Sequence, residues 1–284
     1  MIHKTSKDLL SFDRWEAFYK NQLDWDQYSV LFKQYVDLYY QDTLRQLNEA
    51  KPVSNCIYLE IGCGPFFLGQ LLADKCRYVI GVDMSPSALG VASRMLAEKH
   101  ITNYLLIRAD IRHLPIKSSS VELIYGGGVI EHFSDTLQAV RELFRVLSFG
   151  GVSFNTAPYA NLGACTYRQL WGNIPNIPII KQLAEWVHIK LLKGRHLVFG
   201  YELSFTQRQL YNIHSKAGFR DIKISKFQVA LCFYHFHKWL RPYLEELANS
   251  SPLFWPMLKV VAKKQASNNS LQQNQVLTIV RTTV

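Results

Sequence analysis

The chain contains 284 residues, of which 48% are hydrophobic and 13% aromatic, and it carries a net charge of +10. This length and composition allow a large buried core and exclude a mostly disordered chain. The five cysteines form no Cys-x-x-Cys pair and no cluster with histidine, so we expect neither a metal site nor a disulfide framework. We see no secretory signal and no apolar run of ~20 residues, and we therefore expect a cytoplasmic protein.

The positive charge belongs to the C-terminal part of the chain. Residues 161–284 contain 16 Lys and Arg against 5 Asp and Glu, a balance of +11, whereas residues 1–160 contain 16 and 17, a balance of −1. A basic surface can attract nucleic acid, anionic lipid or an acidic small molecule, or can serve solubility alone. The charge by itself does not choose among these.

Residues 1–54 are expected to form a helical cap. Between residues 8 and 50, aromatic and aliphatic residues recur at helical spacing among charged ones, which predicts one or two amphipathic helices. Pro52 and Ser54 then interrupt the pattern, as is typical of a boundary.

Strands and helices are expected to alternate over residues 55–157. The expected strands are 56–61, 78–83, 104–110, 120–127 and 152–157, and the expected helices are 67–75, 85–99 and 135–147. The second of these helices has Ser85 at its N-cap and Pro86 at its first position. Such alternation predicts parallel strands joined by crossover helices, and hence an α/β doubly wound sheet.

The alternation then stops and returns only in part. Residues 158–203 form a first insertion that is rich in apolar, aromatic and basic residues. The core continues over 204–229 with a capped helix and a strand. An irregular aromatic stretch at 230–262 and a polar linker make up a second insertion, 230–275, and residues 276–284 are expected to hold the last strand of the core.

The turn after the first expected strand reads Gly62-Cys63-Gly64-Pro65. In doubly wound sheets, ligands bind outside the carboxyl ends of the strands, where glycine lets the backbone approach them. A Gly-x-Gly alone is weak evidence, because ordinary strand-to-helix turns use glycine as well.

Acidic residues at the next two strand ends strengthen the case. Asp83 lies 21 residues after Gly62 and can accept hydrogen bonds from both hydroxyls of a ribose. Asp110 can accept a bond from the exocyclic amine of adenine, with Ile111 against the ring. Each acid alone could be an N-cap or a solvated strand end, but the ordered series predicts a nucleoside-containing cofactor.

At this point the sequence resembles the class I S-adenosylmethionine-dependent methyltransferases. The motifs that carry the resemblance are "LEIGCGP", "GVDMS", "RADIRHLP", "GGGVIEHF" and "RVLSFGGVSFN", in the family's order and spacing. It covers residues 55–157 and, more loosely, 204–229 and 276–282. It implies a seven-stranded, mostly parallel, Rossmann-like sheet with an antiparallel last strand, with N-terminal helices and with both insertions over the substrate side.

The resemblance also implies the cofactor, S-adenosyl-L-methionine, and its binding residues. These are Glu60, Gly62, Cys63, Gly64, Asp83, Met84, Asp110, Ile111, Gly126 and Gly127. The turn after the first strand would lie under the methionine part, the two aspartates would hold ribose and adenine, and the two later glycines would lie along the methionyl group. Phe66 departs from the family, which commonly has glycine there, and is expected to narrow the pocket.

No catalytic residue follows from the motifs with certainty. His132, in "IEHF" after the fourth strand, is a candidate general base, since the family often has Glu-His at this place. The alternative is a residue that orders the start of a helix. A base is needed only if the acceptor must lose a proton during in-line methyl transfer.

The insertions are expected to determine the acceptor. Within 177–196, apolar residues fall near one helical face and basic residues follow, which fits either a lid helix on the core or an interfacial helix in peripheral contact with an anionic membrane. The aromatic and basic composition favours a small-molecule or lipid-like acceptor with an apolar or aromatic body.

Two other functions are alternatives. A nucleic-acid methyltransferase is disfavoured, because "GGGV" stands where base-amine methyltransferases usually have Asp/Asn-Pro-Pro-Tyr. A non-catalytic, cofactor-binding partner subunit is the second alternative, with the basic aromatic segments as its docking surface. The sequence predicts no oligomeric state.

Overall fold

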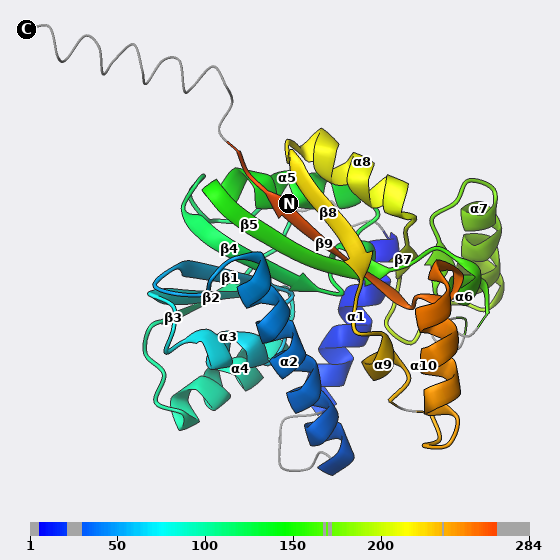
Figure 1. The fold of residues 1–284 in the computed structure, drawn as a ribbon, viewed down its shortest axis with the longest axis horizontal. Coiled ribbons are helices and arrows are strands. Elements are labelled where there is room, and N and C mark those ends of the chain that lie inside the picture. The colour runs from blue at the N-terminus through cyan, green and yellow to red at the C-terminus, as the bar shows by residue number, and fades with distance from the viewer. Residues whose placement is uncertain (1–5, 22–29, 167–168, 170–171, 235, 266–284) are drawn as a thin grey trace, which may run out of the picture.

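The computed structural model describes residues 6–21, 30–166, 169, 172–234 and 236–265. At its centre is a twisted seven-stranded sheet, which Figure 1 shows with helices on both faces. The strand order is β3-β2-β1-β4-β5-β9-β8, and β9 runs antiparallel to β5 and β8 while the other neighbours are parallel. The predicted Rossmann-like fold is confirmed.

The first five strands follow the predicted order. They are β1 (Ile57–Ile61), β2 (Tyr78–Asp83), β3 (Tyr104–Arg108), β4 (Val121–Gly127) and β5 (Leu147–Pro158). Side chains alternate between the faces of the sheet, so Tyr58 packs into one hydrophobic cluster and Leu59 into the other. Burial on both faces explains why these strands are almost continuously apolar.

Four of the helices that cover the sheet lie between its strands in the chain, two on each face. They are α3 (Phe67–Leu72), α4 (Pro86–Glu98), α5 (Thr136–Val146) and α8 (Gln207–Ala217). Buried residues of α3 and α4 share one cluster, and those of α5 and α8 share the other. The predicted N-cap is present, since Ser85 Oγ accepts a hydrogen bond from the backbone N–H of Ala88.

The last strands correct one prediction. β8 (Asp221–Lys226) lies where expected, but β9 (Met257–Lys263) falls mostly within the stretch taken as irregular. Its residues alternate between partly exposed and buried, with Leu258, Val260 and Ala262 in the core. The expected strand at 276–282 lies outside the described residues, and β9 occupies the place between β5 and β8.

Two helices precede the sheet, α1 (Ser6–Asn21) and α2 (Val30–Ala50). The first insertion contains α6 (Leu162–Cys165), β6 (Ile174–Pro175), α7 (Ile180–Glu185), the π-helical segment η4 (Trp186–Leu191) and β7 (Leu203–Ser204). The second contains α9 (Val229–Cys232), α10 (Arg241–Ser250) and the short turn η5 (Pro252–Phe254). α1 lies beside α4 and across the carboxyl ends of the strands, so it covers the edge at which ligands bind in this fold.

Candidate functional site

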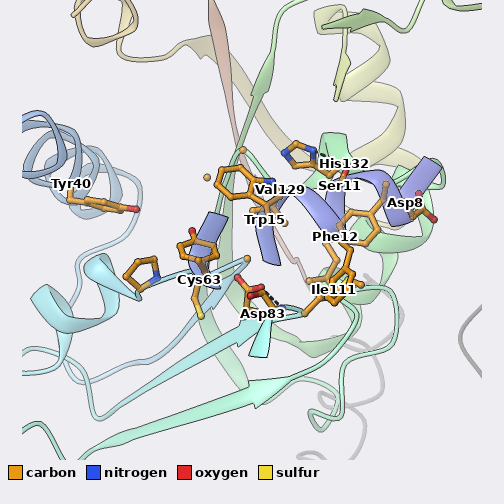
Figure 2. A pocket seen from close by; sticks show the side chains of 18 residues that line it. Asp8, Ser11, Phe12, Trp15, Tyr40, Cys63, Asp83, Ile111, Val129 and His132 are labelled. Atoms are coloured by element: carbon orange, nitrogen blue, oxygen red, sulfur yellow. Dashed lines mark hydrogen bonds between the residues drawn. The ribbon is translucent and has the colours of Figure 1, made fainter. Parts of the chain in front are cut away.

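A cavity of about 220 Å³ lies at the carboxyl edge of the sheet, between α1 and the turns that follow β1, β2 and β4. Figure 2 shows side chains of α1, including Phe12 and Trp15, on one side of it and Cys63 and Asp83 on another. Of the ten residues predicted to bind the cofactor, six line this cavity: Gly62, Cys63, Asp83, Met84, Ile111 and Gly127. The other four, Glu60, Gly64, Asp110 and Gly126, are not among the lining residues.

The turn after β1 requires its two glycines. Gly62 and Gly64 have φ angles of +55° and +50°, in the left-handed region that favours glycine. A Cβ atom at Gly64 would lie 2.4 Å from the hydroxyl of Tyr19 on α1, so a larger residue would require the Tyr19 side chain to move. This turn therefore brings its backbone directly against the cavity and its cover.

Phe66 does not narrow the cavity, contrary to the expectation. Its side chain is fully buried, and its ring fills the space beside Gly69, where an added Cβ would lie 2.2 Å from it. The residue has a φ of 62°, which directs the ring into the core between β1, β2 and α3. The departure from the family's glycine is thus accommodated inside the protein rather than in the site.

Asp83 is fixed by the backbone on both of its oxygens. Oδ2 accepts a hydrogen bond of 2.9 Å from the N–H of Gly64, and Oδ1 accepts one of 2.8 Å from the N–H of Ser85. Burial raises the pKa of this carboxyl, while the backbone donors oppose that change. A carboxylate oxygen can accept more than one hydrogen bond, so Asp83 can still accept bonds from a ligand in the cavity.

Glu60 lies behind the turn rather than in the cavity. Its Oε2 accepts hydrogen bonds from the hydroxyl of Tyr58 and from the N–H of Gly69, at 3.1 and 2.9 Å. Burial raises its pKa to about 8. The side chain therefore joins β1 to α3 and holds the glycine turn from beneath.

Asp110 is also turned away from the cavity, because Arg112 takes both of its oxygens. The guanidinium donates to Oδ2 at 2.7 Å from Nη2 and to Oδ1 at 3.0 Å from Nε. It also donates from Nη1 to Asp8 of α1 at 2.8 Å. All three side chains are at most 8% exposed. The pairing thus ties α1 to the turn after β3, where only Ile111 faces the cavity.

The wall contributed by α1 and α2 was not predicted at residue level. The cavity is lined by five residues of α1 and one of α2: Asp8, Ser11, Phe12, Trp15 and Tyr19, and Tyr40. On α1, the spacing of Ser11, Phe12, Trp15 and Tyr19 along one helical face was the sequence signal that could have identified the wall.

Glu16 attaches α1 to the N-terminus of α4. Its carboxylate accepts hydrogen bonds of 2.6 Å from the hydroxyls of both Ser85 and Ser87. These bonds help to lower the pKa of Glu16. The helix is thus held over the cavity at both Asp8 and Glu16, about two turns apart.

His132 lines the cavity and has a defined tautomer. Its Nδ1 lies 2.8 Å from the carbonyl oxygen of Tyr201, which can only accept, so Nδ1 carries the proton and Nε2 is left as an acceptor. Burial lowers the pKa of the ring, which favours its neutral form. Ser11 donates to the same carbonyl at 2.9 Å. The ring is therefore held in a form that can take up a proton.

Residues 59–154 match a family model described as a methyltransferase domain. The chain is 31% identical over 205 residues to a malonyl-[acyl-carrier protein] O-methyltransferase of Marinomonas sp., covering 69% of this chain and 71% of that protein. It is 27% identical over 212 residues to the demethylmenaquinone methyltransferase of Lactiplantibacillus plantarum, covering 69% of this chain and 82% of that protein. A probable S-adenosylmethionine-dependent methyltransferase of Mycolicibacterium smegmatis is 36% identical over 105 residues, which cover 35% of this chain and 37% of that protein.

Solved structures agree on the fold. A phosphoethanolamine N-methyltransferase of Haemonchus contortus, in complex with S-adenosyl-L-methionine, superposes with a TM-score of 0.56 at 18% identity, over 80% of this chain and 53% of that one. The YcgJ protein of Bacillus subtilis gives 0.53 at 17% identity, over 80% of this chain and all of that one. At this level of identity the likeness concerns the fold alone.

Proposed function

The chain belongs to the class I S-adenosylmethionine-dependent methyltransferases, and we propose that it methylates a small-molecule or lipid-like acceptor with an apolar or aromatic body. The observation that supports this acceptor class is the aromatic lining of the cavity, with Phe12, Trp15, Tyr19, Tyr40 and Phe133 around it. Such a lining favours an apolar acceptor and excludes water from the reacting groups.

The residues present fit the cofactor. The carboxylate of Asp83, held by two backbone N–H groups, would accept the ribose hydroxyls. Gly62, Cys63 and Gly127 would lie along the methionine part, and Met84 and Ile111 would pack against adenine. When bound, the cofactor supplies a methyl group on a positively charged sulfur, which is already activated for transfer.

We assign the predicted residues outside the cavity to positioning. Glu60 holds the glycine turn from beneath, and Asp110 reaches the site only through Arg112 and Ile111. Gly126 allows its neighbours to pack closely against the backbone, because an added Cβ would lie 2.6 Å from Oδ1 of Asn155. One contribution of the protein to rate is the alignment of acceptor and methyl group, which supplies up to roughly 7–11 kcal/mol in ideal cases.

His132 is our candidate for the general base. A phenol or other hydroxyl must lose a proton as it gains the methyl group, and a neutral imidazole with a free Nε2 can accept it. The carbonyl of Tyr201 would stabilise the protonated ring through Nδ1. This arrangement favours an acceptor with an ionisable hydroxyl or an acidic carbon over one that reacts as a free amine.

The test is transfer of an isotopically labelled methyl group from S-adenosylmethionine to a panel of acceptors. Because relatives are named for demethylmenaquinone and malonyl-[acyl-carrier protein], these two come first, followed by simple phenols and lipid-linked phenols. We expect transfer to at least one apolar or phenolic member and none with the Asp83→Ala variant. Transfer restricted to hydrophilic acceptors would refute the proposed class.

A further inference from the structure

Exposed apolar side chains concentrate on the first insertion. Five exposed side chains make up what we call the apolar face. They are Ile179 (78% exposed), Ile180 (42%), Leu183 (62%), Trp186 (53%) and Leu191 (59%). They lie on α7, on η4 and on the residue before them. Five large apolar side chains exposed within residues 179–191 are uncommon on a soluble monomer, where such a group usually marks an interaction site.

The opposite side of the same helix rests on the protein. Ala184 and Ile189 pack against the main hydrophobic cluster. Glu185 accepts a hydrogen bond of 2.6 Å from the hydroxyl of Tyr201 and pairs with Lys7 of α1 at 2.7 Å. The helix is therefore anchored inward by one side, and its larger apolar side chains point away from the core.

Cations accompany the apolar face. Lys190 is exposed next to Leu191, the last residue of this face, and Lys193 and Arg195 are exposed just after it. Glu185 is the one acidic residue in 177–200, and its charge is already paired inward with Lys7. An apolar stripe beside exposed Lys and Arg, without competing acids, is the pattern of a helix that lies in the interface of an anionic bilayer.

The second insertion places further apolar side chains at the same end of the molecule. Trp239 and Tyr243 are 64% and 68% exposed. β6 contacts both α7 and α6, α6 contacts η5, and η5 contacts α10, so these elements form one continuous edge, on the right in Figure 1. Charge on α10 is mixed because Glu246 is exposed there, so α7 and η4 carry the inference.

We propose that the apolar face docks the enzyme on an anionic lipid bilayer. Trp186 and Leu183 would enter the headgroup region while Lys190 and Lys193 meet the lipid phosphates. None of the helices in the described part of the chain combines the length and the apolarity that a membrane span needs. The docking itself is independent of the proposed function. Its purpose, access to a lipid-like acceptor, rests on that proposal.

Hydrogen bonds connect the docking helix to the cavity. Tyr201 bonds Glu185 of α7 with its hydroxyl, and its carbonyl accepts bonds from Ser11 and His132 in the cavity wall. One residue thus links the apolar face to the site. An acceptor held in the bilayer would meet the protein close to the cavity, without first crossing bulk water.

The experiment is co-sedimentation of the full chain with vesicles of phosphatidylcholine, with and without phosphatidylglycerol. We expect binding to the anionic vesicles, reduced by salt, and a loss of about tenfold or more in Leu183→Glu/Trp186→Glu. The matched control is Leu105→Glu on β3, where a leucine 45% exposed lies away from the insertions. Lys190→Ala/Lys193→Ala should weaken binding to anionic vesicles alone.

Three results would overturn the docking: equal binding to both vesicle types, unchanged binding by Leu183→Glu/Trp186→Glu, or no vesicle binding together with a dimer that this variant dissociates. Circular dichroism of each variant checks that it folds. Methyl transfer measured in detergent separates the two proposals. An enzyme active in detergent that ignores vesicles refutes the docking, whereas one that binds vesicles but methylates no apolar acceptor refutes the proposed function.

Discussion

Replacing Asp83 tests the placement of the cofactor most directly. A hydrogen bond to a charged acceptor contributes about 1.5–3 kcal/mol, so losing the two ribose bonds should cost about 3–6 kcal/mol. This predicts that the dissociation constant of S-adenosylmethionine rises by about two to four orders of magnitude in Asp83→Ala. Calorimetric titration with S-adenosylmethionine and, separately, S-adenosylhomocysteine measures it.

The same substitution should also lower stability, because Asp83 satisfies the N–H groups of Gly64 and Ser85. Leaving a buried donor without a partner costs about 1–3 kcal/mol, which gives about 2–6 kcal/mol for the two. We expect a loss in the lower half of this range. Burying the Asp83 carboxyl has a desolvation cost, which also raises its pKa, and the substitution removes that cost. Chemical denaturation provides the free energy of unfolding.

Asp83→Asn is the matched control. It keeps the shape of the side chain and one acceptor oxygen, so its free energy of unfolding should be closer to that of the wild type. It should still lose most of the affinity for the cofactor that depends on the negative charge. If Asp83→Ala, shown to be folded, bound the cofactor within about twofold of the wild type, the ribose would lie elsewhere and the assignment of the cavity would be wrong.

Three further predictions concern buried charges and histidines. Arg112→Met leaves the carboxylates of Asp8 and Asp110 without their cation, and should lower the free energy of unfolding by about 3–5 kcal/mol in a denaturant titration; a change below about 1 kcal/mol would contradict the pairing. His132→Gln should lower kcat on a hydroxyl acceptor by about 10²-fold and leave the affinity for the cofactor unchanged. The wild-type rate should fall as the pH drops through the lowered pKa of this histidine. An unaltered kcat in the variant would exclude His132 as the base. Burial lowers the pKa of His214 to about 4, so the unfolded chain takes up a proton first as pH falls, and stability should decline by about 3 kcal/mol from pH 6.5 to 4; His214→Phe should remove this decline.

Much of the fold could be predicted because its signals are local. Ser85 and Pro86 set the start of α4, and continuous apolar runs set the buried strands. β9 was missed because Lys259 and Lys263 interrupt an apolar pattern that continues directly from the aromatic Phe254 and Trp255. The alternation of Leu258, Val260 and Ala262 was present in the sequence, but the preceding aromatics obscured it.

The parts of the site that depend on backbone geometry could be predicted from the sequence. The parts that depend on contacts between distant side chains could be predicted less well. Gly62 and Gly64 follow from the turn itself. That Asp110 would pair with Arg112, two residues along the chain, depends on Asp8 of α1, which no local pattern connects to it. The direction of the Phe66 ring likewise depends on the space left by Gly69 and Gly81, an outcome of packing between separate elements.

The pairing of Arg112 with two aspartates gives the molecule an internal separation of charge. Two carboxylates and one guanidinium leave one net negative charge beside the cavity, where Asp83 and Glu16 also lie. Exposed Lys190, Lys193 and Arg195 lie instead beside the apolar face, in a protein whose total charge is +10. The positively charged sulfur of a bound cofactor would thus meet a local excess of negative charge. Loss of the methyl group would leave that sulfur as a neutral thioether, so the attraction would weaken when the spent cofactor must leave.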